Sequence, residues 1–307
     1  MDHRQALDAR AMSLMLALCL IWGFQQVLLK AAAADITPLF QIALRTGVAA
    51  VLVGLVMLRQ GQRITVSDSS WRAGLFVGVL FAIEFLLIGE SLRFTLASHL
   101  VVFLYTAPVF VALGLHWKLP SERLAPLQWL GVLLAFGGIV VAFSGRSTGA
   151  GDLADILWGD LLALLAGLAW GATTIAVRLT GLAREPATKT LLYQLAIGFV
   201  ILMLAVLALG QFHFKPTPIA WGSLVFQSLI VSFASYLAWF WLLRHYLASR
   251  LGVFSFLTPL FGVGFGVWLL DEPLEPAFLI GASLVCGGIV LVSGYGYVQQ
   301  FLAREPR

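Results

Sequence analysis

The strongest constraint on this chain is a series of ten apolar stretches, each long enough to be a transmembrane helix. A helix of about 20 mostly apolar residues spans the hydrocarbon core of a bilayer. Only 11% of the 307 residues are charged and 60% are hydrophobic, whereas soluble domains are about 25% charged. The sequence therefore predicts an all-α polytopic membrane protein with ten transmembrane helices. The stretches cover residues 11–30, 38–58, 71–91, 95–117, 126–144, 157–178, 188–209, 220–243, 250–270 and 276–297.

The basic residues predict how these helices are oriented. With the amino terminus in the cytoplasm, 14 of the 19 Lys and Arg residues fall in cytoplasmic segments, four in outer segments and Arg45 inside a helix. Cytoplasmic loops carry an excess of Lys and Arg, so we expect a multi-pass protein of the cytoplasmic (inner) membrane with both termini in the cytoplasm. The net charge of +4 then sets topology, and no nucleic-acid partner is expected. Cys19 and Cys286 both lie in apolar stretches and indicate neither a disulfide nor a zinc site.

The two halves of the chain repeat each other. Ala97–Gly114, which contains Pro108, corresponds to Ala248–Gly266, which contains Pro259, at an offset of 151 residues. A proline inside a helix removes a backbone hydrogen bond, and a membrane helix tolerates this where neighbours or a cavity satisfy the freed carbonyl. Each half holds five helices, and this odd number predicts an inverted repeat: residues 1–144, a linker at 145–156, residues 157–297, and a cytoplasmic tail at 298–307. Two broken helices at matching places indicate a substrate site near the midplane, with the prolines as kinks that gate it.

Further matching residues make the chain resemble the EamA-type family of the drug/metabolite transporter superfamily. They are Trp22-Gly23 and Trp170-Gly171, Arg45, Ala97-Ser98 with Pro108, Ala248-Ser249 with Pro259, Glu122 and Glu272, and Gly137-Gly138 and Gly287-Gly288. The resemblance implies a basket in which the first, third and fourth helices of each half line a central cavity. Within the family, the sequence is similar to bacterial exporters of aromatic amino acids. It departs from the family pattern in the second half, where Leu195–Gly198 occupies the region matching Arg45.

Intramembrane polar residues are the first candidates for function, because a charge at the bilayer centre costs roughly 2.5–3.5 kcal/mol on insertion scales. Glu84 is the one charged residue of the stretch 75–89. We expect a carboxylate that faces the cavity and binds a substrate ammonium or carries a proton; the alternative is a protonated acid bonded to a neighbouring helix. Arg45 is expected to pair with a carboxylate, with Glu90 as a candidate, or with helix carbonyls.

Aromatic and polar residues at matching depths complete the predicted cavity. Ligand pockets are mostly apolar or aromatic with a few placed polar groups, although packing and interhelical hydrogen bonds are the alternative role for each residue. The eighth stretch places Gln227, Ser228, Ser232, Ser235 and Trp239 on one helical face, bordered by Tyr236. The candidates are Trp22, Gln25, Gln26, Phe103, Tyr105, Trp170, Thr173, Thr174, Gln227, Ser235, Tyr236, Trp239 and Phe254, together with Glu84.

These features predict a secondary transporter that exports aromatic or other large neutral amino acids by alternating access. The alternatives are an exporter of another small metabolite or drug, proton-coupled through Glu84, a passive channel, and an intramembrane enzyme. The sequence has no P-loop, G-x-S-x-G or H-E-x-x-H motif, and we expect no catalysis, cofactor or metal. The expected partners are a small-molecule substrate and the lipid bilayer; the sequence leaves the oligomeric state open and is compatible with a monomer.

Overall fold

The computed structural model describes residues 7–62, 70–91, 93–95, 97–143, 153–270 and 276–302. Glu272 and residues 145–152 of the expected linker lie outside these ranges, as do residues 303–307 of the expected tail. Within the described ranges, ten helical segments are long and apolar enough to cross a membrane, which confirms the predicted number. The expected linker and tail are partly helical, because α7 begins at Leu153 and α13 continues to Leu302.

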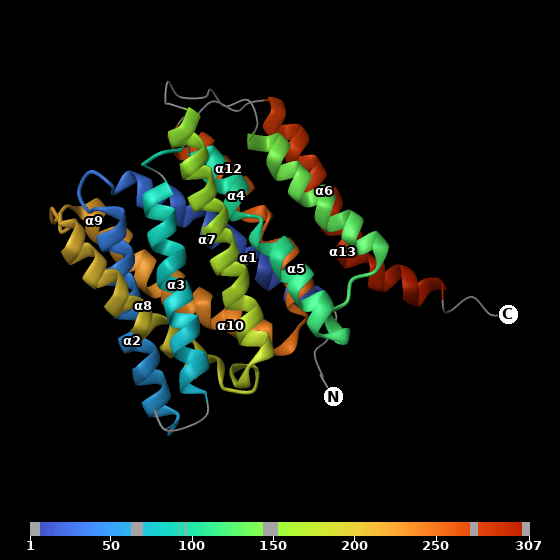
Figure 1. Ribbon diagram of the computed structural model, residues 1–307, viewed down its shortest axis with the longest axis horizontal. Helices are drawn as coiled ribbons and strands as arrows, with labels where there is room; N and C mark the ends of the chain where they lie inside the picture. Colours follow the sequence, from blue (N-terminus) through green and yellow to red (C-terminus); the bar gives the residue numbers. More distant parts are fainter. Residues whose placement is uncertain are drawn as a thin grey trace.

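Seven of the ten spans are single helices, two are broken near their centres, and one contains a π-helix (Figure 1). The helices of the first half are α1 (Ala9–Ala31), α2 (Pro38–Arg59), α3 (Trp71–Ser91), α4 (Ala97–Leu104), α5 (Ala107–Lys118), the short 3-10 helix η1 (Pro120–Glu122) and α6 (Pro126–Phe143). Those of the second half are α7 (Leu153–Leu179), η2 (Gly181–Ala183), α8 (Ala187–Leu209), α9 (Pro218–Val225), the π-helix η3 (Phe226–Ser235), α10 (Tyr236–His245), α11 (Ala248–Phe254), α12 (Leu257–Leu270) and α13 (Pro276–Leu302).

The breaks in the fourth and ninth spans precede their prolines instead of coinciding with them. The fourth span breaks after Leu104, and Pro108 is the second residue of α5. The ninth breaks after Phe254, and Pro259 is the third residue of α12. A proline in the first turn of a helix loses no intrahelical hydrogen bond and has a suitable φ. The expected kinks at Pro108 and Pro259 are therefore displaced by about one turn, because each proline starts the second half-helix.

The helices of the two halves are interleaved. α1 packs on α12, and its counterpart α7 packs on α4 and α5; α3 packs on α7 and α8, while its counterpart segment η3 packs on α1 and α2. Each of these pairs joins one half to the other, and exchanging the halves converts one set of pairs into the other. This arrangement is the inverted repeat of five helices, and it leaves the centre of the molecule to be lined by both halves.

The last helices of the two halves form a separate pair at one edge of the molecule (Figure 1). A Cβ atom added to Gly138 would lie 2.6 Å from the Gly281 carbonyl oxygen, and one added to Gly131 would lie 2.8 Å from that of Gly288. Glycine is needed at these positions because the backbones of α6 and α13 approach each other closely.

Exposed tryptophans lie near the ends of the spans. Trp71 is the first residue of α3, Trp117 is the penultimate residue of α5, Trp158 and Trp221 lie in the first two turns of α7 and α9, and Trp268 is near the end of α12. Tryptophan collects at the two water interfaces of a membrane. The large aliphatic side chains that are exposed between these ends, such as Val51 and Leu133, then face lipid.

Candidate functional site

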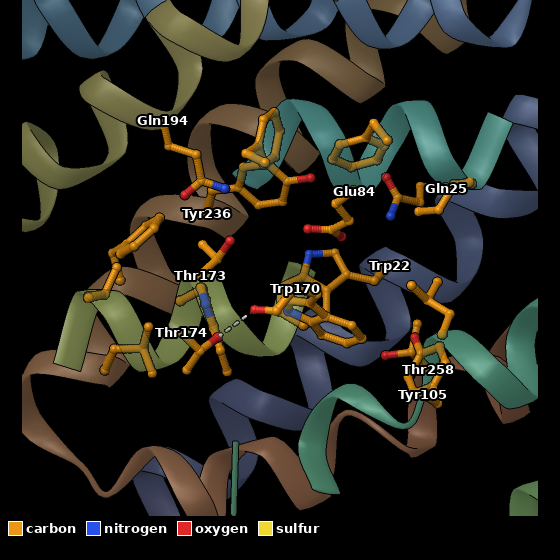
Figure 2. A pocket seen from close by; sticks show the side chains of 18 of the residues that line it. Trp22, Gln25, Glu84, Tyr105, Trp170, Thr173, Thr174, Gln194, Tyr236 and Thr258 are labelled. Carbon is orange, nitrogen blue, oxygen red and sulfur yellow. Dashed lines mark hydrogen bonds between the residues drawn. The ribbon is translucent and has the colours of Figure 1, made fainter. Parts of the chain in front are cut away.

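A cavity lies at the centre of the molecule, between the two halves (Figure 2). The space in it that is open to the centre of a water molecule measures about 130 Å³. α1, α3 and the broken α4–α5 span contribute to its wall from the first half, and α7, α8, α10 and α12 from the second. The lining residues are Trp22, Gln25, Gln26, Phe81, Glu84, Phe85, Ile88, Leu104, Tyr105, Trp170, Thr173, Thr174, Val177, Gln194, Tyr236, Trp239, Phe240, Leu243 and Thr258.

Two edge-to-face aromatic pairs frame the cavity. The ring centroids of Trp22 and Trp239 are 5.8 Å apart, and those of Tyr105 and Trp170 are 5.5 Å apart. The Trp22 indole also donates a hydrogen bond of 2.9 Å to the Ser235 hydroxyl. Edge-to-face pairs fix ring orientations, so these side chains form a firm apolar wall for a flat solute.

Glu84 is the only charged residue among the described residues that line the cavity. Its carboxylate points into the cavity among Trp22, Gln25 and Tyr236 (Figure 2). It has no hydrogen-bond partner among the described residues, although the charge of Arg45 acts on it. A carboxylate in such a position can accept a hydrogen bond from a solute or take up a proton.

Arg45 lies directly behind the cavity wall and is 3% exposed. One terminal nitrogen donates to the Gln25 side-chain oxygen at 2.8 Å and to the Gln227 side-chain oxygen, and the other donates to the Tyr236 hydroxyl at 3.4 Å. Among the described residues, its hydrogen-bond partners are therefore side-chain amides and a phenol, and the candidate pairing with Glu90 is wrong. Glu90 lies near the carboxyl-terminal end of α3, where it forms an exposed ion pair with Arg93 at 2.7 Å.

Ten of the fourteen predicted site residues line the cavity, and four do not. Gln227 is fully buried because it bonds Arg45 behind the wall, and Ser235 supports the Trp22 ring from outside the lining. Phe103 is not among the lining residues, whereas the next two residues, Leu104 and Tyr105, line the cavity at the break between α4 and α5. Phe254 is buried in the apolar core, where its carbonyl accepts a hydrogen bond from the Cys19 thiol. The expected face of η3 is distorted because this segment is a π-helix and not an α-helix.

Sequence reasoning missed several lining residues that had a detectable signal. Phe81, Phe85 and Ile88 lie three before, one after and four after Glu84, which is the spacing of one helix face. Gln194 is the last side-chain amide of α8 before its long apolar run begins at Leu195. When the first residues of α2 and α8 are aligned, Gln194 is the repeat counterpart of Arg45, and the stretch Leu195–Gly198 is not.

A buried ionic cluster joins the halves at one side of the cavity. The Glu122 carboxylate accepts hydrogen bonds from the Arg178 Nε at 2.8 Å, from the Ala248 and Ser249 backbone N–H groups at 3.0 Å each, and from the Ser249 hydroxyl at 2.7 Å. Glu122 belongs to the first half, whereas its partners belong to the second. The cluster therefore fastens η1 to the end of α7 and the start of α11.

Comparisons with known proteins agree with this architecture. The chain is 25% identical to the uncharacterized transporter YoaV of Bacillus subtilis (strain 168), over 90% of this chain and 94% of the relative. It is 27% identical to the uncharacterized transporter YvbV of the same strain, over 98% of this chain and 97% of the relative. A solved crystal structure superposes with a TM-score of 0.79 at 20% identity, covering 93% of this chain and 98% of the other, which shows a shared fold.

The two halves also match one family separately. The EamA-like transporter family matches residues 9–144 and again residues 157–294. The two matched segments correspond to the two interleaved sets of five helices around the central cavity. The protein therefore belongs to the EamA-like transporter family and is a multi-pass membrane transporter.

Proposed function

We propose that this transporter exports amino acids with aromatic or other large neutral side chains across the cytoplasmic membrane. The observation that carries the proposal is the Glu84 carboxylate, which faces an aromatic cavity between the halves without a hydrogen-bond partner among the described residues. A substrate ammonium supplies the missing donors. The rings of Trp22, Trp170 and Trp239 offer apolar surface for the side chain of the substrate.

Alternating access is the mechanism that we propose for this cavity. The excess of Lys and Arg in the segments that include the ends of α7 and α10 supports a cytoplasmic location for the Glu122 cluster. In that orientation the cluster closes the cytoplasmic side, and substrate entry requires its bonds to open. The breaks before Pro108 and Pro259 supply points at which half-helices can move relative to each other.

Reconstitution in liposomes tests the proposal. Liposomes that contain the purified protein are loaded with each amino acid of a panel. The dependence of flux on amino acid concentration is then measured with and without a pH gradient. We expect saturable flux of phenylalanine, tryptophan or leucine and none of aspartate. If no amino acid shows saturable flux, the substrate assignment is refuted and the family assignment stays intact.

A second candidate is a proton-coupled exporter of another amphipathic metabolite or drug. It is favoured by the position of Glu84 as the one charged residue of the described cavity lining, since such a group can carry a proton in exchange for a cationic solute. The same liposomes distinguish the two candidates. If the second candidate is correct, an imposed pH gradient drives uptake of a cationic amphiphile but not of neutral amino acids. Flux that does not saturate indicates a channel.

A further inference from the structure

Arg45 determines which polar atoms the cavity presents. A guanidinium only donates hydrogen bonds, so the groups that bond it must turn their oxygen atoms toward it. Gln25 does so with its side-chain oxygen and Tyr236 with its hydroxyl oxygen. Gln227 does the same, and its amide nitrogen is held at 3.0 Å by the Gln25 backbone carbonyl.

The consequence is that two donors are left facing the cavity. With its oxygen on Arg45, the Gln25 amide must direct its NH₂ group to the other side, and Figure 2 shows this nitrogen directed toward Glu84 and Trp22. The Tyr236 oxygen accepts from Arg45, so its O–H must point away from the guanidinium. Neither donor has a partner among the described residues, and both side chains line the cavity.

The two donors lie beside the acceptor Glu84, and this arrangement has a chemical counterpart. Gln25 and Tyr236 bond the same guanidinium, so they are neighbours in the wall and suit the two oxygens of a carboxylate. Glu84 suits an ammonium. An α-amino acid carries both groups on one carbon atom. The charges agree as well: Arg45 and Glu84 sum to zero, a zwitterion adds no net charge, and an amine would leave an uncompensated cation in the membrane interior.

We propose that Arg45 is a positioning residue that turns Gln25 and Tyr236 into a binding pair for the substrate carboxylate. The transporter thereby selects an α-amino acid over the amine that lacks the carboxylate. This inference rests on the proposed amino acid substrate. Arg45 does not itself touch the substrate: it acts through the two side chains that stand between its guanidinium and the cavity.

The test compares three probes in the same liposomes: phenylalanine, phenylalaninamide and phenethylamine. For the unaltered protein we expect phenylalanine to be preferred over phenethylamine in kcat/KM by roughly 10- to 100-fold, as for the loss of hydrogen bonds to a charged group. Arg45→Met should lower this ratio toward one, because Gln25 and Tyr236 can then turn their oxygens to the cavity. Tyr236→Phe, which is less disruptive to folding, should lower it in the same direction by a smaller factor.

Arg93→Met is the matched control, since Arg93 pairs with Glu90 on the surface and away from the cavity. It should keep the ratio of the unaltered protein. The inference is overturned if Arg45→Met or Tyr236→Phe still transports phenylalanine with an unchanged ratio. Its failure is distinct from that of the proposed function: absence of saturable phenylalanine flux in the unaltered protein refutes both, whereas saturable flux with an unaltered ratio in the variants refutes the role of Arg45 alone.

Discussion

Glu84 can be tested against a glutamate on the same helix. Glu84→Gln keeps the size of the side chain and removes its charge, so it should reduce transport at least tenfold or abolish its pH dependence, because the substrate ammonium or the proton loses its partner. Glu90→Gln, at the exposed carboxyl-terminal end of α3, should transport normally. The measurement is initial flux between pH 5.5 and 8.5, and equal rates for Glu84→Gln and the unaltered protein at every pH would contradict the role.

Asp8 offers a prediction at the surface. Its carboxylate caps α1 by accepting a 2.7 Å hydrogen bond from the Ala11 N–H, and both of its oxygens accept at 3.0 Å from the Tyr246 hydroxyl. The backbone hydrogen bond from Ala11, with a smaller contribution from Tyr246, holds the pKa of Asp8 below its ordinary value of 3.8.

The sign of the pH effect follows from this lowered pKa. The folded protein binds the proton of Asp8 less readily than the unfolded chain, so the stabilisation is complete above pH 3.8 and is lost as the pH falls through the folded-state pKa. We expect the difference in unfolding temperature between the unaltered protein and Asp8→Asn, measured in detergent, to shrink as the solution is acidified below pH 4. A difference that stays constant from pH 7 to pH 3 would show that the charge of Asp8 is not involved.

At the scale of the element, the pair formed by α6 and α13 gives a sharp comparison between adjacent glycines. A Cβ on Gly138 would lie 2.6 Å from the backbone of α13, whereas a Cβ on Gly137 meets nothing within 4 Å. Gly138→Ala should therefore destabilise the protein by about 1–3 kcal/mol through overpacking, and Gly137→Ala should be neutral or slightly stabilising. Thermal unfolding of the two variants in the same detergent decides, and equal unfolding temperatures would mean that the two helices do not touch here.

The elements also show how far the sequence can be interpreted. The apolar stretches predict the ten spans because hydrophobic length is a local property, and the repeat predicts that Trp22 and Trp170 occupy matching sites. The kinks expected at Pro108 and Pro259 lie about one turn earlier in the structure, because a proline is compatible with both an interrupted helix and a first turn. Gln227 and Ser235 could not be distinguished from Tyr236 by helical spacing, since η3 is a π-helix with a different number of residues per turn. Which polar group bonds Arg45 depends on contacts between distant segments, and no local pattern contains them.

At the scale of the whole molecule, the Glu122 cluster predicts a shift between conformations. Glu122→Gln removes the charge that faces Arg178 in a buried site, where breaking an ion pair costs about 3–5 kcal/mol. A contact made in only one conformation favours that conformation, so its loss should open the side of the cavity next to Glu122. The reporter is a cysteine at Val177, which lines the cavity on α7, in a background with Cys19→Ala and Cys286→Ala.

We expect a membrane-impermeant maleimide added from the side of the membrane on which Glu122 lies to label Val177→Cys several-fold faster when Glu122→Gln is present. Glu185→Gln, which removes a half-buried ion pair with Lys189 away from the Glu122 carboxylate, is the matched control and should leave the labelling rate unchanged. Slower or equal labelling in Glu122→Gln would show that the cluster supports folding but does not hold the cavity closed.

The glycine contacts of α6 and α13 bear on how a chain with two repeats could arise. Gly131 corresponds to Gly281 in the repeat, and Gly138 to Gly288, yet Gly131 meets Gly288 and Gly138 meets Gly281. Each contact is the image of the other, which is the relation found where two identical subunits meet across a two-fold axis. A chain of half this length, inserted into the membrane in both orientations, would already possess this surface. Fusion of two such copies would fix their number and their opposite directions, and would leave each half free to acquire its own residues, such as Arg45 in one and Gln194 in the other.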